Sequence, residues 1–170
     1  MSADRRAAAL VLPAVVAVVA VLLSVLAAAA ATRSSSRLAD SVGDTHEVAG
    51  VLAAARTEVA TALSYDYRHL DADFARATAV MTPAFRKKYL ATTAKGVKPL
   101  AVKYKATSAA QVTSAGLVEG TRDRAVVLVF VAQTASNSQL TTGPRLDRSR
   151  IRTTLVRSGD RWLIDDLDPV

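Results

Sequence analysis

The sequence has 170 residues, and 22 Lys and Arg against 15 Asp and Glu give it a formal charge of +7 and a pI of about 10.1. This length suits one domain with its own hydrophobic core. There is no Cys, which excludes disulfides, thiol catalysis and thiolate metal sites. With only His46 and His69 to supply imidazole, a histidine-rich metal cluster is excluded as well.

An uncharged apolar stretch follows Arg5 and Arg6 and runs from Ala7 to Ala31. As a helix it would reach about 37 Å, against a hydrocarbon core of about 30 Å. We expect an uncleaved transmembrane helix within residues 1–32. A cleaved signal peptide is the alternative, because the small residues Ala27 to Ala31 suit a cleavage site. The short basic tail predicts a cytoplasmic N-terminus and a C-terminal domain outside the cytoplasm.

A polar juxtamembrane linker is expected over residues 33–44 and an exported domain over 45–170. The domain opens with apolar residues at three- and four-residue steps, namely Val48, Leu52, Ala55, Val59 and Leu63. This spacing predicts a helix from about Thr45 to Ser64.

A short second helix is expected next, with Asp71 or Asp73 as its N-cap. Its apolar face would consist of Phe74, Ala77 and Met81.

A third helix is predicted to begin at Thr82 and Pro83, because Thr suits the N-cap and Pro the first helical position. Gly96 and Pro99 are expected to end it. Its apolar face would consist of Phe85, Tyr89 and Thr93.

After Pro99 the period of the apolar residues changes to two, which indicates strands. Turn signals at 119–123 and 157–160 separate them. The run from Arg124 to Thr134 is so apolar that we expect a central strand covered on both faces. Helices followed by about four antiparallel strands predict an α+β fold, with two or three helices packed on one face of a curved sheet.

Several segments resemble Mce-associated membrane proteins of mycobacteria and related actinobacteria. The resemblance covers residues 63–89 and 124–170, where its motifs are NSQLT (137–141), DRSR (147–150) and GDRWLI (159–164). It departs from the family pattern at the turn formed by Met81, Thr82 and Pro83. The resemblance implies a cone-like domain of the nuclear-transport-factor-like (cystatin-like) class. It also implies an accessory or stabilising role, without enzymatic activity, beside Mce lipid-import complexes.

Three carboxylates near the C-terminus, Asp165, Asp166 and Asp168, raise the question of a metal or acid/base site. Adjacent strand residues point to opposite faces, so Asp165 and Asp166 are poorly placed to act together. We interpret them as the solvated end of a strand, paired with an arginine-rich neighbour.

A second polar constellation comprises Tyr65, Asp66, Tyr67 and His69. Cone-like folds can use an Asp base and a Tyr donor in the cavity. We favour a helix end whose aromatic side chains close the mouth of the cone, because a shared fold confers no activity. Tyr65, Asp66, Tyr67 and Trp162 are the candidate cavity or partner contacts.

A third constellation is basic and contains no acidic residue: Arg86, Lys87, Lys88, Lys95, Lys98, Lys103 and Lys105. Outside a membrane, such a run favours anionic lipid headgroups or an acidic partner over nucleic acid. An ordinary solvated face is the alternative.

The leading hypothesis is therefore a single-pass envelope protein, not an enzyme, that stabilises an Mce-type lipid transporter and binds no cofactor, metal or nucleic acid. One alternative is a small-ligand carrier or enzyme that uses a cavity containing Asp66. Another is an assembly factor for a different envelope machine, such as a secretion system.

Overall fold

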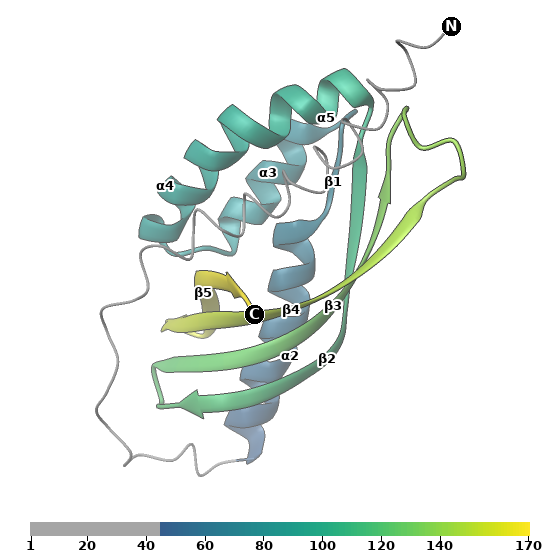
Figure 1. The fold of residues 1–170 in the computed structure, drawn as a ribbon. Coiled ribbons are helices and arrows are strands. Elements are labelled where there is room, and N and C mark those ends of the chain that lie inside the picture. The colour runs from purple at the N-terminus through teal and green to yellow at the C-terminus, as the bar shows by residue number, and fades with distance from the viewer. Residues whose placement is uncertain (1–44) are drawn as a thin grey trace, which may run out of the picture.

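The computed structural model describes residues 45–170 (Figure 1). The expected membrane helix and linker lie outside the described residues. The helices are α2 (Thr45–Leu63), α3 (Leu70–Ala79), α4 (Pro83–Thr92), the π-helical turn η1 (Thr93–Val97) and α5 (Lys98–Tyr104). Over residues 45–170, no helix combines the length and the apolar character needed to cross a membrane.

The strands form one antiparallel sheet in the order β1-β2-β3-β4-β5. They are β1 (Tyr65–Asp66), β2 (Thr107–Gly120), β3 (Arg124–Ser136), β4 (Arg145–Ser158) and β5 (Arg161–Pro169). The four long strands match the expectation, and both turn regions lie where the sequence placed them. The two-residue β1 was not predicted.

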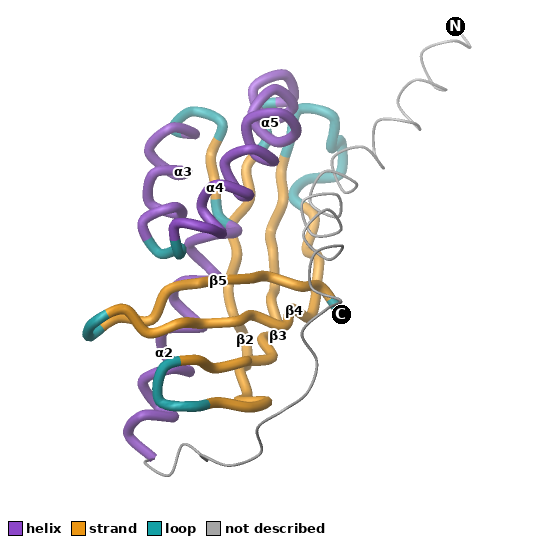
Figure 2. The backbone as a smooth tube through the Cα atoms, turned by 90° about the vertical axis from the view of Figure 1, so that its left-hand side faces the viewer, coloured by secondary structure: helices purple, strands orange, loops and turns teal. Residues whose placement is uncertain are grey.

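The helices cover one face of a strongly curved sheet (Figures 1 and 2). Helix α2 crosses behind the long strands, and α3 and α4–η1–α5 gather at one end. This arrangement confirms the α+β prediction. The core between the layers includes fully buried side chains from α2 (Val51, Val59), the α3–α4 region (Met81, Phe85) and the sheet (Val127, Ile151, Leu155, Ile164).

Helix α3 begins differently from the prediction. Its N-cap is His69, without a side-chain capping bond, and Asp71 and Asp73 both lie in the first turn. Asp73 is buried and reaches back to the backbone of Asp66 instead of capping its own helix. The start of α4 follows the prediction, since the Thr82 hydroxyl accepts the N–H of Phe85 and Pro83 follows it.

The third helix does not end at Gly96 and Pro99. It continues through η1 into α5 and ends at Tyr104. The reason lies in its buried residues, which recur at every fourth position: Phe85, Tyr89, Thr93, Val97 and Ala101. In a regular α-helix that spacing drifts by about 40° per step. The wider π turn takes up this drift and keeps all five side chains on the core.

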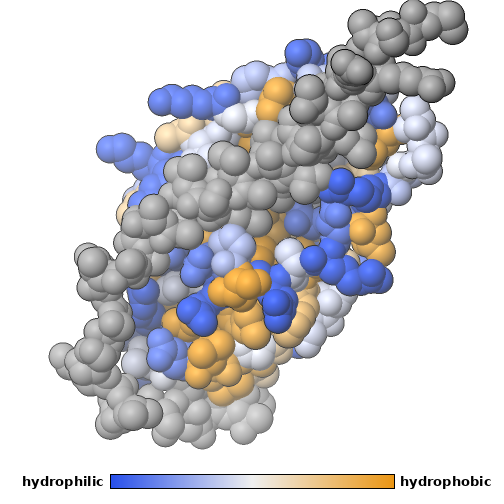
Figure 3. Space-filling model, viewed as in Figure 1, coloured by the Kyte–Doolittle hydropathy of each residue, from blue (hydrophilic) through white to orange (hydrophobic). Residues whose placement is uncertain are grey.

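The expectation that β3 is covered on both faces was wrong in part. Val127, Val129 and Val131 face the helices and are buried, but Phe130 on the opposite face is 41% exposed. No helix among residues 45–170 lies on that face (Figure 2). In the space-filling view, apolar side chains on this side are interspersed with hydrophilic ones (Figure 3).

Candidate partner-binding groove and neighbouring clusters

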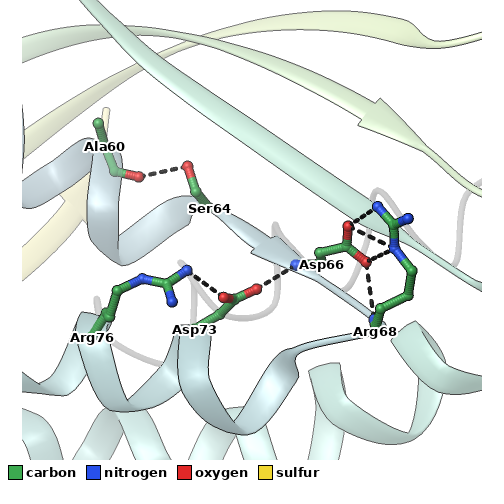
Figure 4. Close-up of polar contacts among 6 residues, drawn as sticks. All are labelled: Ala60, Ser64, Asp66, Arg68, Asp73 and Arg76. Atoms are coloured by element: carbon green, nitrogen blue, oxygen red, sulfur yellow. Dashed lines mark hydrogen bonds and ion pairs between the residues drawn. The ribbon is translucent and has the colours of Figure 1, made fainter.

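The Asp66 carboxylate is fully engaged by Arg68 (Figure 4). It accepts the backbone N–H of Arg68 at 2.9 Å and the guanidinium Nε at 3.0 Å. Hydrogen bonds from the Arg68 side chain and backbone lower the pKa of Asp66 to about 2. A carboxylate this acidic is a weak base at neutral pH, so Asp66 is poorly suited to the general-base role considered from sequence.

A buried carboxylate, Asp73, lies beside Asp66 and joins α3 to β1. It accepts the Asp66 N–H at 2.7 Å and a short bond from the Arg76 guanidinium. Ser64 completes the junction (Figure 4). Its hydroxyl donates to the Ala60 carbonyl at 2.7 Å and accepts the N–H of Ala110 at 3.0 Å, which ties the end of α2 to β2. These polar groups bind one another and hold the elements together.

Replacement of Asp73 by Ala should lower the free energy of unfolding by about 1–3 kcal/mol, because it leaves the part-buried N–H of Asp66 without its acceptor. Urea denaturation measures the loss. The matched control is Asp71→Ala on the same helix. Asp71 is 88% exposed and pairs with Lys98 at the surface, so its removal should cost less than about 1 kcal/mol. Equal losses for the two variants would contradict a structural role for Asp73.

In a pH titration, the Asp66 carboxyl carbon should show an NMR midpoint near 2, and Arg68→Ala should raise it. Because the pKa of Asp66 is lower in the folded state than in the unfolded state, its ionised carboxylate stabilises the fold fully at a pH above the unfolded pKa of about 3.9. This stabilisation is lost as the pH falls through the folded-state pKa of Asp66. A midpoint that does not respond to Arg68→Ala would show that another group holds the charge.

The tyrosines of this segment pack against the core. The Tyr65 ring lies 6.4 Å from that of Phe74, which meets Tyr89 edge-on at 6.2 Å. Burial raises the pKa of Tyr65 and of Tyr89, and the Tyr89 hydroxyl donates to the Ala62 carbonyl at 3.0 Å. Tyr67 is half-buried beneath Arg68, whose guanidinium carbon is 5.9 Å from the ring centroid.

Trp162 lies elsewhere, in an open groove of about 450 Å³ between α2 and the β4–β5 hairpin. One wall consists of α2 residues at helical spacing, Glu47, Gly50, Ala54 and Glu58. The other consists of Arg157, Asp160, Arg161 and Trp162. Of the four candidate contacts predicted from sequence, only Trp162 lines this groove.

The groove is polar and carries both signs of charge. Arg157 lies over the Trp162 ring, 5.9 Å from its centroid, and one of its nitrogens is 3.8 Å from Glu47. Burial raises the pKa of Glu58, and the nearby Arg161 partly offsets this. Two small residues, several charged groups and an aromatic ring line the groove. Protein–protein interfaces combine the same kinds of groups. The sequence alone does not predict this groove, because its two walls come from segments about 100 residues apart in the chain.

The three C-terminal aspartates do not converge. A bulge in the β4–β5 ladder falls at Asp165, whose carboxylate accepts from the Thr82 hydroxyl at 2.9 Å and from Arg124 at 3.3 Å. Asp166 is half-buried, and burial raises its pKa. Asp168 lies opposite Arg152 inside β5. Residues 45–170 contain no cluster of three potential metal ligands.

The basic residues predicted from sequence all lie on the helix α4–η1–α5 or at its end. Three of them contact other groups of the domain. Arg86 donates from Nε to the Thr78 carbonyl at 2.9 Å, and Lys98 pairs with Asp71 at 2.6 Å. Lys103 lies over the Tyr104 ring at 5.1 Å. All seven side chains are exposed: Arg86, Lys87, Lys88, Lys95, Lys98, Lys103 and Lys105.

This fold recurs in bacterial type IV secretion system proteins and in the periplasmic domain of DotI. An IcmL-like type IV secretion system protein from Legionella pneumophila superposes with a TM-score of 0.62 at 10% identity, over 72% of this chain and 91% of that one. The periplasmic domain of DotI gives 0.61 at 10% identity, over 72% and 94%. CagV, a VirB8 homolog of Helicobacter pylori, gives 0.58 at 8%, over 72% and 97%. The described domain therefore has the VirB8-like α+β fold.

Sequence comparison gives the family. The chain is 34% identical to Outer membrane protein Rv1973 of Mycobacterium tuberculosis over 117 residues, 68% of this chain and 72% of the relative, and it belongs to that protein's family. It is 33% identical over 131 residues to the uncharacterized protein Rv1362c of the same organism. That match spans 77% of this chain and 59% of the relative's length. No family model matches the chain.

Proposed function

We propose that this protein is a membrane-anchored subunit of a multiprotein assembly in the cell envelope, that it has no enzymatic activity, and that the domain over 45–170 lies outside the cytoplasm. The observation that carries the proposal is a filled interior combined with an open surface groove. Phe85, Met81, Leu155 and Ile164 are at most 1% exposed, so side chains occupy the space that a ligand would need. The groove beside Trp162 is open to a partner.

The comparisons support the setting. VirB8-like domains are named as parts of type IV secretion systems, and a family relative is named an outer membrane protein. These names favour an assembly subunit of an envelope machine over a soluble carrier. The pairing of Asp66 with Arg68 at the surface supports the assembly subunit over a cavity enzyme or ligand carrier that uses Asp66.

A second candidate is a stabilising role beside an Mce-type lipid transporter. The motifs at 137–141, 147–150 and 159–164 favour it through their resemblance to Mce-associated proteins. Both candidates use the same anchored, partner-binding domain and differ in the proteins that it contacts. The identity of the bound subunits separates them.

Affinity capture of the tagged full chain from cross-linked membranes, followed by quantitative mass spectrometry, tests the proposal. The informative variant is Gly50→Leu, which fills the groove. A Cβ at Gly50 meets nothing within 4 Å, so the fold should tolerate the larger side chain. We expect recovery of the envelope partners to fall about tenfold, the effect of losing one central contact.

The matched control is Gly116→Leu on β2, where a Cβ also meets nothing within 4 Å. It should leave recovery unchanged. Capture of secretion-machine subunits would favour the first candidate, and capture of Mce subunits the second. Recovery of no envelope protein, or equal recovery with both variants, would refute binding through the groove.

A further inference from the structure

The outward face of the helix α4–η1–α5 is built as two straight rows. The first row contains the residues one position after each member of the buried row that begins at Phe85: Arg86, Leu90, Ala94, Lys98 and Val102. The second row contains the residues two positions after each of them: Lys87, Ala91, Lys95, Pro99 and Lys103. All ten residues are exposed. Because they share the four-residue spacing of the buried row, the π turn that aligns the core also aligns these rows on the outside.

Charge is distributed unevenly along the chain in a way that singles out this helix. All six lysines of the protein lie between Lys87 and Lys105, whereas the permanently charged basic residues outside 86–105 are all arginines. No Asp or Glu occurs between Asp73 and Glu119. Lysine carries a compact charge on a long flexible stem, so it can cover an apolar surface and still reach a phosphate.

Large apolar side chains are exposed among these lysines. Leu90 is 44% exposed and Val102 is 56% exposed, and both lie in the first row with Ala94 between them. On a helix facing water, these exposed apolar side chains do not contribute to stability. In the headgroup region of a bilayer they are buried while the lysines contact lipid phosphates, as in interfacial amphipathic helices.

We propose that the two rows on α4–η1–α5 form a docking face for an anionic lipid bilayer. The inference rests on the proposed membrane anchoring, which keeps the domain beside a bilayer. Fully extended, the twelve residues over 33–44 span at most about 43 Å, which is more than the length of α2, about 28 Å. A chain of this length between the proposed membrane anchor and α2 lets the docking face on α4–η1–α5 reach the membrane.

A fluorescent probe at Ala94→Cys tests the proposal in the full chain reconstituted into nanodiscs. The chain has no Cys, so this label is unique. A quencher attached to the lipids should quench it in discs that contain phosphatidylglycerol and not in discs of phosphatidylcholine alone. High salt should abolish the quenching. A second probe at Gln111→Cys, exposed on β2, should stay unquenched in both.

Neutralising three lysines tests whether their charges drive docking to the lipid. Each lysine near an anionic surface favours docking about fivefold, so Lys87, Lys95 and Lys103 changed together to Gln should shift the equilibrium roughly a hundredfold toward the undocked state. The matched control changes three exposed arginines of β4, Arg148, Arg150 and Arg152, to Gln. It removes the same charge and should leave quenching intact.

The outcomes separate this inference from the proposed function. An unquenched probe in a chain that stays in the discs refutes the docking face and leaves the anchored subunit standing. Protection of the probe only after an envelope protein is added assigns the face to an acidic partner and also refutes lipid docking. A chain that leaves the discs refutes anchoring. Lysine-dependent binding of that chain to phosphatidylglycerol vesicles would still uphold the docking face.

Discussion

Replacement of Phe85 by Ala is expected to lower the free energy of unfolding by about 3–5 kcal/mol. Phe85 is 1% exposed and begins the row of buried residues along α4–η1–α5. Its loss would leave a cavity where the helix meets the rest of the core, and the surrounding side chains could close it only in part. Urea denaturation followed by circular dichroism measures the change.

The control is Leu90→Ala on the same helix. Leu90 is 44% exposed, so its truncation should cost less than about 1 kcal/mol. A similar small loss for Phe85→Ala would mean that the interior is loosely packed. It would then remain open to a ligand, and the case against a cavity function would fail.

Ile164→Ala should cost about 2–5 kcal/mol and loosen the junction between the sheet and α4. The Ile164 side chain is fully buried. Its backbone N–H donates to the Val80 carbonyl, and its carbonyl accepts the Thr82 N–H, both at 2.9 Å. These bonds form a parallel bridge at Met81 that joins β5 to the start of α4. Loss of the side chain should weaken the bridge that it supports.

Hydrogen exchange at the Thr82 amide reports on that junction, and urea denaturation on the whole domain. Exchange should accelerate in Ile164→Ala more than in Leu163→Ala, whose side chain is only half-buried on the other face of β5. Equal exchange rates in the two variants would show that the bridge does not depend on packing at Ile164.

Local signals predicted most of the fold. Apolar spacing gave α2, and Thr82 followed by Pro83 marked the start of α4. Turn residues separated β2 from β3 and β4 from β5. Each of these features depends on residues close together in the chain, which is why the sequence alone predicted it.

The errors share one cause, which is that tertiary contacts override local preference. Gly96 and Pro99 are ordinary stop signals, yet the helix continues because Val97 and Ala101 are needed in the core. Asp73 is a good capping residue, yet it accepts the N–H of Asp66 on another element. A single sequence shows such demands only through a spacing pattern. Here that pattern is the strict four-residue repeat beginning at Phe85.

The candidate sites were harder to predict than the fold. Sequence reasoning grouped Trp162 with Tyr65 and Tyr67, but Trp162 lines a groove with Gly50 and Ala54, and the tyrosines pack on the core. The groove joins α2 to the last hairpin, a contact that no local motif encodes. The basic run, by contrast, was visible in the sequence because its residues are consecutive. The arrangement of these basic residues in straight rows could not be predicted, because it depends on the π turn.

The most direct test of the proposed anchored subunit is the native size of the full-length protein, extracted from membranes in mild detergent and followed by an antibody on a native gel. We predict migration with a complex far larger than the 17.9 kDa chain, reduced in amount by Gly50→Leu. Recovery of the protein as a free monomer, or in the culture fluid and not in the membranes, would contradict the account.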